Sequence, residues 1–456
     1  MNRVAKRSTI TLLLVLFLLS GMVLFTGRFL GNGEDWAAFP GNPHTSSSDL
    51  VVKDREGTVL LEDLRGEKAR YADDAELRAA TVHWLGDRSG SILAPAVDYY
   101  RQNILDYSLV NGLYGYSNTG GEAVMTLSGE LQKLAVEAMD GRKGTIGVYN
   151  YKTGEILCAV TTPNFDPDHV PDIEGDTTGA YEGVYLNRFT QGAYVPGSIF
   201  KIVTTAAALE ELPDALELEF TCNGTCEIGG EELTCEGNHG TIGLKTALAK
   251  SCNCYFGQLA QVLGRDTLEE YVEKLQVTKP QSFDGITTAP GNYDIRRASD
   301  VQVSWSAIGQ HTDLVNPSRF MTLMGVIAGG GEAAEPHIIS DAQFGDSTAY
   351  TAKPGSTGRL LSEQTCETLT ELMRNNVVRI YGEDNFPGMT VCAKSGTAQL
   401  GGDREPNATF AGFVADEEYP LAFMIVVENG GSGSKTCVPI LSEVLRGCKR
   451  LMDAES

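Results

Sequence analysis

Positive charge is scarce in this chain. Its 456 residues include 36 Lys and Arg against 60 Asp and Glu, so the formal net charge is −24. Proteins that bind nucleic acid rely on Lys and Arg to neutralise phosphates, so the composition argues against a nucleic-acid partner. Internal repeats are also lacking, which argues against a repeat architecture. The length allows two or three domains with sizeable cores.

One long apolar stretch lies near the N-terminus. Arg3, Lys6 and Arg7 precede an uncharged run, Ser8–Gly27. As a helix this run spans about 30 Å, the thickness of the hydrocarbon core of a bilayer. The basic flank predicts that residues 1–7 stay in the cytoplasm and that the rest of the chain lies outside. A cleaved signal peptide is the alternative, but no Ala-x-Ala site follows the run, so we expect a retained anchor at residues 8–27.

Ser198 and Lys201 form a Ser-x-x-Lys pair directly after a turn at Pro196-Gly197. Residues three apart share one face of a helix, so the hydroxyl and the amine can meet. A helix N-terminus also offers unpaired N–H groups and partial positive charge, which suit an oxyanion beside an activated serine. The pair alone is a weak signal, since a capped core helix with a surface lysine has the same sequence pattern.

Two further motifs follow in the chain, Ser251-Cys252-Asn253 and Lys394-Ser395-Gly396-Thr397. Separately, the first is typical of a helix cap or turn and the second of a strand with a glycine bulge. In this order, however, the three motifs correspond to the Ser-x-x-Lys, Ser-Asp-Asn and Lys-Thr-Gly set of β-lactamases and penicillin-binding proteins. The chain therefore resembles a class B penicillin-binding protein, a monofunctional peptidoglycan D,D-transpeptidase, of the short-pedestal type.

The resemblance implies a catalytic role for five side chains. Ser198 is the nucleophile, and Lys201 is its base. Burial and a second cation, Lys394, would keep that base neutral for part of the time. Ser251 would relay protons to the leaving amine, and Asn253 would hold the donor amide and orient the base.

The third motif is also implied to bind the substrate. Thr397, with Ser395 as the lesser candidate, should hold the terminal carboxylate of the donor beside the positive Lys394, and Gly396 should let the strand approach the substrate backbone. The implied oxyanion hole is the backbone N–H of Ser198 and of Thr397. The family's substrate is the D-alanyl-D-alanine end of a peptidoglycan stem peptide, which β-lactam antibiotics mimic by leaving a slow ester on the serine. These steps need no metal or other cofactor.

The resemblance also implies an α+β fold. We expect a penicillin-binding/β-lactamase-like transpeptidase domain, an antiparallel sheet flanked by helices, at residues 122–456. It would stand on a linker and small non-catalytic pedestal at 28–121, with one transmembrane helix before them. Residue patterning predicts a mainly helical segment at 73–106, a strand hairpin at 144–160 and a C-terminal helix at 434–452.

The segment 28–121 is too short for the glycosyltransferase domain of class A relatives. We therefore expect glycan polymerisation to fall to a partner, a membrane glycosyltransferase of the FtsW and RodA type. Two alternatives stay open. A membrane-anchored D,D-carboxypeptidase or β-lactamase would use water as acceptor, but no residue that activates this water is evident. The other is a β-lactam sensor or an inactive scaffold of a wall-synthesis complex, against which the complete motif set argues.

Ten cysteines are many for a chain of this kind. Cys222, Cys226, Cys235 and His239 gather in a polar, glycine-rich stretch, with a spacing that could ligate zinc. Outside the membrane a disulfide is at least as natural, so we expect a Cys222–Cys235 bridge first, unpaired thiols second and zinc third. Most other cysteines, Cys252 among them, are expected to be small buried side chains.

Overall fold

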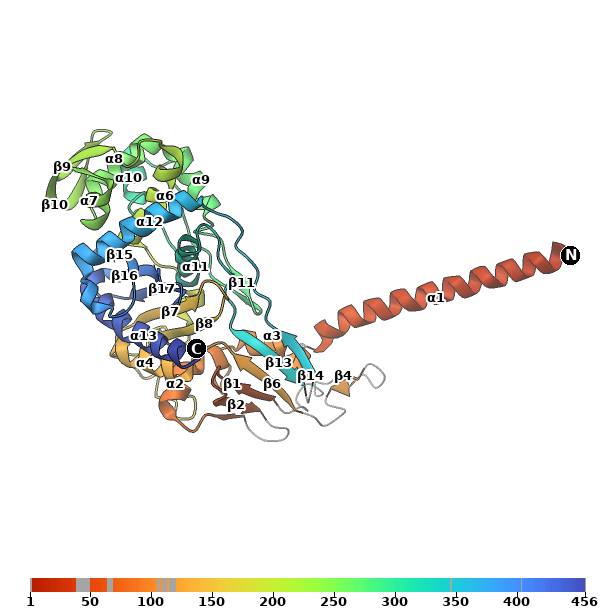
Figure 1. Ribbon diagram of the computed structural model, residues 1–456. Helices are drawn as coiled ribbons and strands as arrows, with labels where there is room; N and C mark the ends of the chain where they lie inside the picture. Colours follow the sequence, from red (N-terminus) through yellow and green to blue (C-terminus); the bar gives the residue numbers. More distant parts are fainter. Residues whose placement is uncertain are drawn as a thin grey trace.

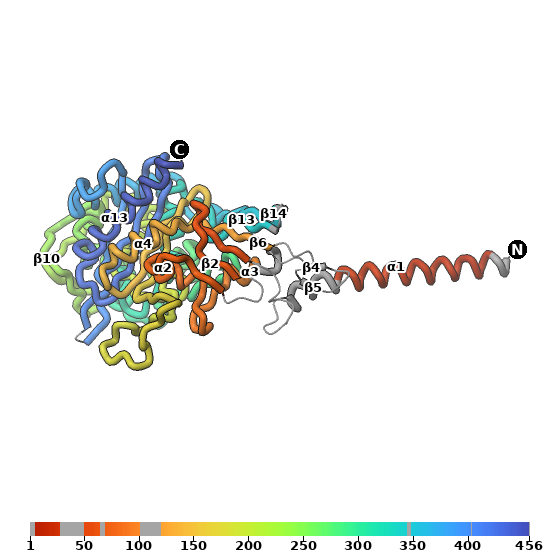
Figure 2. The backbone as a smooth tube through the Cα atoms, turned by 90° about the horizontal axis from the view of Figure 1, so that it is seen from below, coloured from red at the N-terminus to blue at the C-terminus, as the bar shows by residue number. Residues whose placement is uncertain are grey.

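The first element of the structure stands apart from the rest. In the computed structural model, α1 (Asn2–Ala37) extends away from a body formed by the other elements (Figures 1 and 2). Within α1, Ala5–Gly27 is long and apolar enough to cross a membrane. Its mean hydropathy is 2.4, and its apolar side chains are not buried against the rest of the protein. The helix continues to Ala37, into the predicted linker. The structure describes residues 2–37, 50–63, 69–104, 107–108, 113–114, 120–344, 347–402 and 404–455.

A five-stranded antiparallel sheet forms the centre of the body, in the order β15-β16-β17-β7-β8. Every residue of β7, β8, β16 and β17 is buried, because other elements cover both faces of the sheet. The hairpin predicted at 144–160 is β7–β8, and β15, which carries the third motif, forms one edge. The strands are β7 (Gly144–Asn150), β8 (Ile156–Thr162), β15 (Val391–Ala398), β16 (Asn407–Val414) and β17 (Leu421–Val427).

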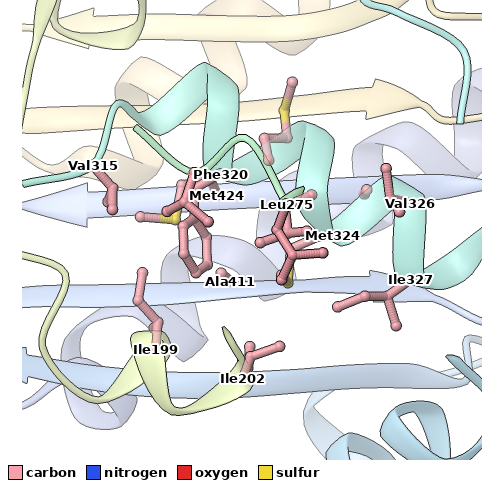
Figure 3. Packing of buried hydrophobic residues seen from close by; sticks show 14 of the residues in the cluster. Ile199, Ile202, Leu275, Val315, Phe320, Met324, Val326, Ile327, Ala411 and Met424 are labelled. Atoms are coloured by element: carbon pink, nitrogen blue, oxygen red, sulfur yellow. The ribbon is translucent and has the colours of Figure 1, made fainter. Parts of the chain in front are cut away.

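Helices cover the two faces of this sheet. On one face α4 (Gly129–Met139) packs with α13 (Gly433–Glu455), which is the predicted C-terminal helix. On the other face α11 (Pro317–Ala328) lies over β16, β17 and β7. Figure 3 shows Phe320 and Met324 of α11 packed with Met424 of β17, beside Ile199 from the segment of the predicted nucleophile. That segment is therefore held in the hydrophobic core.

A mainly helical lobe lies beside β15 and contains a long strand hairpin, drawn in green in Figure 1. The hairpin, β9 (Glu219–Ile228) and β10 (Glu231–Gly243), turns at Gly229-Gly230. Both glycines have positive φ, +59° and +84°, as the two-residue turns that suit twisted hairpins require. The helices of the lobe are α6 (Lys201–Glu211), α7 (Leu244–Ala249), α8 (Asn253–Leu263), α9 (Arg265–Lys274) and α10 (Asp300–Ser306).

A second sheet includes the strands of the predicted pedestal, in the order β14-β13-β6-β1-β2-β3, with β1 and β6 parallel and the other pairs antiparallel. β13 and β14 come from within the expected transpeptidase domain and join this sheet through β6, so the chain returns to the pedestal late. The strands are β1 (Leu50–Lys53), β2 (Val59–Asp63), β3 (Arg70–Tyr71), β6 (Gly121–Met125), β13 (Ile339–Phe344) and β14 (Ser347–Thr351).

The remaining elements are shorter or peripheral. The helical segment predicted at 73–106 contains α2 (Ala75–Leu85) and α3 (Pro95–Ile104). The predicted α+β fold is confirmed by the two sheets and their flanking helices. The other elements are α5 (Arg188–Gln191), η2 (Gly197–Phe200), α12 (Glu363–Asn376), η3 (Val377–Tyr381), η4 (Glu383–Asn385), β4 (Tyr107–Ser108), β5 (Leu113–Tyr114), β11 (Ser282–Phe283) and β12 (Ile286–Thr287).

Candidate active site

Ser198 lies in η2, a short 3₁₀ turn that leads into α6, rather than in the first α-helical turn itself. The preceding Gly197 has a φ of +59° and donates its N–H to the carbonyl of Gly309 at 2.8 Å. A side chain at Gly197 would place its Cβ 2.8 Å from the backbone oxygen of Thr397. The turn therefore needs glycine, both for its left-handed conformation and for its close approach to β15. Ser198 itself is half-buried and lines a cleft.

Lys201 is completely buried, and its Nζ lies 3.0 Å from Ser198 Oγ. The amine also donates to the carbonyl of Ser251 at 2.7 Å and to Asn253 Oδ1 at 2.8 Å. Burial lowers the pKa of Lys201 to about 8, because the ammonium form loses its hydration; nearby Cys235 and other groups raise the pKa in part. A pKa near 8 leaves about one amine in ten neutral at pH 7, so the group can accept a proton.

The second motif forms the link between α7 and α8. Ser251 lies in the turn after α7 with a φ of +55°, a left-handed conformation that costs a non-glycine residue about 1 kcal/mol. In this conformation both the carbonyl and the Oγ of Ser251 face Lys201, with the Oγ 3.2 Å from Lys201 Nζ. Asn253 begins α8, and its Nδ2 donates to the carbonyl of Thr234 at 3.1 Å. The amide is thereby held from two sides, with its oxygen toward the lysine.

Lys394 approaches from the edge strand β15 and is also completely buried. Its Nζ donates to Ser251 Oγ at 3.1 Å and to the carbonyl of Ser395 at 2.7 Å. Ser251 Oγ therefore lies within hydrogen-bond reach of both lysines. Burial, and next the charge of Lys201, lower the pKa of Lys394 well below its usual value. The structure thus brings the five predicted catalytic side chains into one connected group.

The two hydroxyl residues of the third motif line the same cleft, which has a volume of about 420 Å³. Ser395 is held by Tyr381, whose hydroxyl accepts from the backbone N–H at 2.8 Å and donates to Ser395 Oγ at 3.0 Å. Thr397 Oγ1 accepts from the N–H of Gly433 at 3.5 Å. The remaining lining residues are Thr234, Cys235, Glu236, Trp305, Ile308, Gln310, Gln399, Ser432 and Ser434.

Gly396 has close neighbours within the protein. A Cβ at Gly396 would lie 2.2 Å from Thr409 Oγ1 and 2.8 Å from the carbonyl of Pro196. The missing side chain therefore lets β15 pack against β16 and against the turn before Ser198. The strand and the nucleophile segment adjoin at this point, which is one reason for glycine here; the expected approach to the substrate backbone stays a prediction.

Several residues at the site carry no motif and escaped the sequence analysis. Tyr381 positions Ser395 from a helix, and Glu236 brings the one carboxylate to the lining of the cleft within the described residues. Trp305 and Gln310 come from α10 and the loop after it. The Gly-Gln pair at 309–310 was the available signal for this loop, since glycine marks a turn that can bring a polar neighbour to a cleft.

The prediction of a disulfide among the cysteines is wrong. All ten cysteines are free, so Cys222 and Cys235 do not form the expected bridge. Cys252 is buried as expected. It also lies with these two cysteines and His239, and the four ligand atoms are all within 4.8 Å of one another. Cys226 is not part of this group. The pattern missed Cys252 because it belongs to the second motif and not to the glycine-rich stretch.

Comparison with known proteins finds a family that matches most of the part of the chain described above. Residues 144–446 match the family described as the penicillin binding protein transpeptidase domain. The peptidoglycan D,D-transpeptidase PbpA of Mycobacterium tuberculosis is 27% identical over 343 residues, which cover 69% of each chain. The stage V sporulation protein D of Bacillus subtilis is 26% identical over 407 residues, which cover 84% of this chain and 60% of that protein.

The solved structures agree on the fold. Penicillin-binding protein A from M. tuberculosis, as a ceftriaxone acyl-enzyme complex, superposes with a TM-score of 0.77 at 23% identity, covering 89% of this chain and 99% of that one. The D,D-transpeptidase domain of a peptidoglycan glycosyltransferase from Eggerthella lenta gives a TM-score of 0.75 at 23% identity, covering 88% and 99%. The arrangement of sheets and helices described above is therefore one that solved proteins share.

Proposed function

Because the chain belongs to the penicillin-binding protein transpeptidase family, we propose that it is a peptidoglycan D,D-transpeptidase that works through an acyl-enzyme on Ser198. The observation that carries this proposal is the continuous hydrogen-bonded group of a half-buried serine hydroxyl, two buried lysines and a second serine at one cleft. Acyl transfer needs a nucleophile, a base in contact with it and a route for the proton to the leaving group. This group offers all three.

In the acylation step, neutral Lys201 takes the proton of Ser198 as Oγ attacks the carbonyl of the penultimate D-alanine. The negative oxygen of the tetrahedral intermediate would lie between the backbone N–H groups of Ser198 and Thr397. Support for this pairing comes from the contact between the turn at Gly197 and β15. The C–N bond then breaks, and the leaving D-alanine takes a proton through the hydroxyl of Ser251, which lies 3.2 Å from Lys201 Nζ.

The second step reverses the proton route. An amine from a neighbouring stem attacks the ester and gives up a proton through Ser251 to Lys201. As the ester C–O bond breaks, Lys201 passes this proton to Ser198 Oγ, which restores the hydroxyl and the neutral amine. The donor's terminal carboxylate would lie by Thr397 and Ser395 during acylation, near the amine of Lys394. We assign Lys201 as the base because its amine contacts the Ser198 hydroxyl at 3.0 Å, whereas the amine of Lys394 contacts Ser251.

The test is a labelling experiment with a penicillin on the purified protein. We expect mass spectrometry to find the adduct on Ser198 and to find none in Ser198→Ala. The ester should persist over many minutes, and a donor stem peptide with a D-amino acid acceptor should give the exchanged product. An adduct on another residue would remove the assignment of the nucleophile. Hydrolysis of the ester within seconds would favour a carboxypeptidase or β-lactamase.

We also propose a membrane setting for this activity. The exposed apolar helix Ala5–Gly27 supports a single-pass anchor, and the basic flank supports a cytoplasmic N-terminus with the body outside. A membrane glycosyltransferase of the FtsW and RodA type is the proposed partner, with α1 and the pedestal as contact elements. Reporter fusions at the C-terminus test the orientation: activity of a periplasmic or extracellular reporter is expected, and activity of a cytoplasmic one would contradict it. Cross-linking from α1 in the membrane tests the partner.

A further inference from the structure

Four potential metal ligands meet in the helical lobe, next to the second motif. Cys222 lies on β9, Cys235 and His239 lie on β10, and Cys252 is the N-cap of α8 between Ser251 and Asn253. Their ligand atoms all lie within 4.8 Å of one another. We call these four side chains the Cys₃His cluster. It joins two segments that are separate in the chain, the hairpin and the catalytic loop.

The distances within the cluster fit one tetrahedral metal ion. The Nδ1 of His239 lies 3.6 Å from the sulfur of Cys222 and 3.6 Å from that of Cys235, and the sulfurs of Cys235 and Cys252 are 3.9 Å apart. Zinc bound at about 2.3 Å from sulfur and about 2.05 Å from nitrogen would separate two sulfurs by about 3.8 Å, and sulfur from nitrogen by about 3.6 Å. A disulfide would need about 2.05 Å between sulfurs. The spacing is therefore that of ligands around a shared centre.

The backbone is shaped to bring these ligands together. In a regular strand, residues four apart are separated by about 13 Å, so Cys235 and His239 could not approach the same point. The pairing of β10 with β9 shifts register between Thr234 and Asn238 and again between Asn238 and Gly240, within this segment. The strand is thus shortened where the two ligands lie.

Backbone donors face two of the sulfurs. The N–H of Asn253 donates to Cys235 Sγ at 3.3 Å, and the N–H of Tyr255 donates to Cys252 Sγ at 3.4 Å. Such bonds stabilise the thiolate form, which is the form that ligates metal. Cys222 Sγ lies 3.3 Å from the carbonyl of Gly237, a contact that a thiol proton satisfies; this proton would leave when a metal binds.

We propose that the Cys₃His cluster binds a structural zinc ion that fixes the second catalytic motif to the β9–β10 hairpin. Thiolate and imidazole ligands suit zinc, and four protein ligands leave no open position for chemistry on the metal. The consequence for the cleft follows from Asn253, which contacts Cys235 through its backbone and Thr234 through its side chain while it accepts from Lys201. With zinc bound, the orientation of Asn253 and Ser251 is set by the hairpin.

The first experiment measures metal content in the purified full chain, isolated under reducing conditions without chelator. We expect about one zinc per chain by elemental mass spectrometry. Cys235→Ser, His239→Ala and Cys252→Ser should each lose most of this zinc. Cys226→Ser is the matched control, because Cys226 lies on β9 close by but outside the cluster; it should keep the full zinc content.

A second measurement covers the case in which a cluster variant does not fold. The unaltered protein is stripped with a chelator and refilled with cobalt, which gives an intense thiolate-to-cobalt absorption band with the visible bands of tetrahedral coordination. Metal content and this spectrum do not depend on acyl transfer, so they stand even if the proposed function fails. Stripping should also slow acylation by a penicillin at least about tenfold and lower the melting temperature, and added zinc should restore both.

Three results would overturn the proposal. The first is that the reduced chain takes up neither zinc nor cobalt. The second is that Cys252→Ser binds as much zinc as the unaltered protein. The third is that the protein isolated from cells carries a Cys235–Cys252 disulfide. Peptide mapping with alkylation of free thiols distinguishes the last result, because a bridged pair would not be alkylated before reduction.

Discussion

Lys394 donates a hydrogen bond of 3.1 Å to the Oγ of Ser251, although 143 positions separate them in the chain. The same oxygen lies 3.2 Å from Lys201 Nζ. Two amines beside one hydroxyl in a buried site repel each other strongly when both are protonated, because the protein interior screens charge poorly. The doubly charged state is therefore unfavourable in free energy. The arrangement favours one neutral amine at a time, and burial lowers the pKa of both lysines. The predictions below assign the base to Lys201 because its amine contacts the Ser198 hydroxyl.

The first prediction concerns the charge of Lys201. Lys201→Arg keeps a cation but cannot release its proton near neutral pH, so a general base is lost. We expect the rate of acylation by a fluorescent penicillin to fall at least about a hundredfold, the lower end of what a positioned base contributes. Lys245→Arg, an exposed lysine on α7, is the matched control and should label normally. Normal labelling of Lys201→Arg would mean that another group takes the proton.

The second prediction concerns pH. Because burial lowers the pKa of Lys201 to about 8, the neutral amine becomes more common as pH rises, and acylation should speed up through pH 8 and then level off. Glu236 raises this pKa through its negative charge, so Glu236→Gln should move the midpoint to lower pH. Rates of acylation between pH 6 and about pH 10 measure both effects. Glu232→Gln, exposed on the same hairpin, should leave the midpoint in place. A rate that does not rise through pH 8 would contradict the assignment.

Tyr381 allows a test of positioning without touching a motif residue. Tyr381→Phe removes the hydroxyl that accepts from the Ser395 N–H and donates to its Oγ. We expect the free energy of unfolding to fall by about 1–3 kcal/mol, because a buried N–H loses its partner. Apparent affinity for the donor peptide should weaken more than turnover of the bound donor. Tyr185→Phe, on an exposed tyrosine, is the comparison in urea titrations. Equal free energies of unfolding for the two variants would show that the Tyr381 hydroxyl does not stabilise the fold.

Gly396 predicts a steric effect at the junction of β15 and the nucleophile turn. Gly396→Ala would drive a methyl group into Thr409 and the carbonyl of Pro196. Overpacking of this kind costs about 1–3 kcal/mol, and here it should also displace Ser198, so stability and acylation should fall together. Gly243→Ala is the control, since the nearest atom to its added Cβ lies at 3.7 Å. Unchanged acylation in Gly396→Ala, measured by the same labelling, would show that the turn tolerates the shift.

The catalytic group could be predicted from the sequence because each motif is local. Ser198 and Lys201 lie one turn apart, and Ser251 with Asn253 occupies a single loop, so spacing alone indicates which side chains belong together. What joins the three motifs is tertiary packing, and there the sequence analysis depended on resemblance. The roles of these residues remain predictions that the experiments above test.

The cysteines show where such reasoning ends. Cys222, Cys235 and His239 stand close in the chain, and their spacing indicated a bridge or a metal. The fourth member, Cys252, comes from the catalytic loop, and only the docking of the irregular strand β10 against α8 reveals it. Register shifts of this kind depend on the contacts of the whole lobe, which a linear pattern does not contain.

The strands β13 and β14, which run from the catalytic half into the pedestal sheet, bear on how the protein can be divided. A fragment starting at residue 122 would keep most of β6 but lose β1, its parallel neighbour. The exposed backbone edge would then recruit strands from other copies, the usual origin of insoluble material. Strand β1 therefore covers the backbone edge of β6. A fragment made for expression in soluble form should retain every residue from β1 onward.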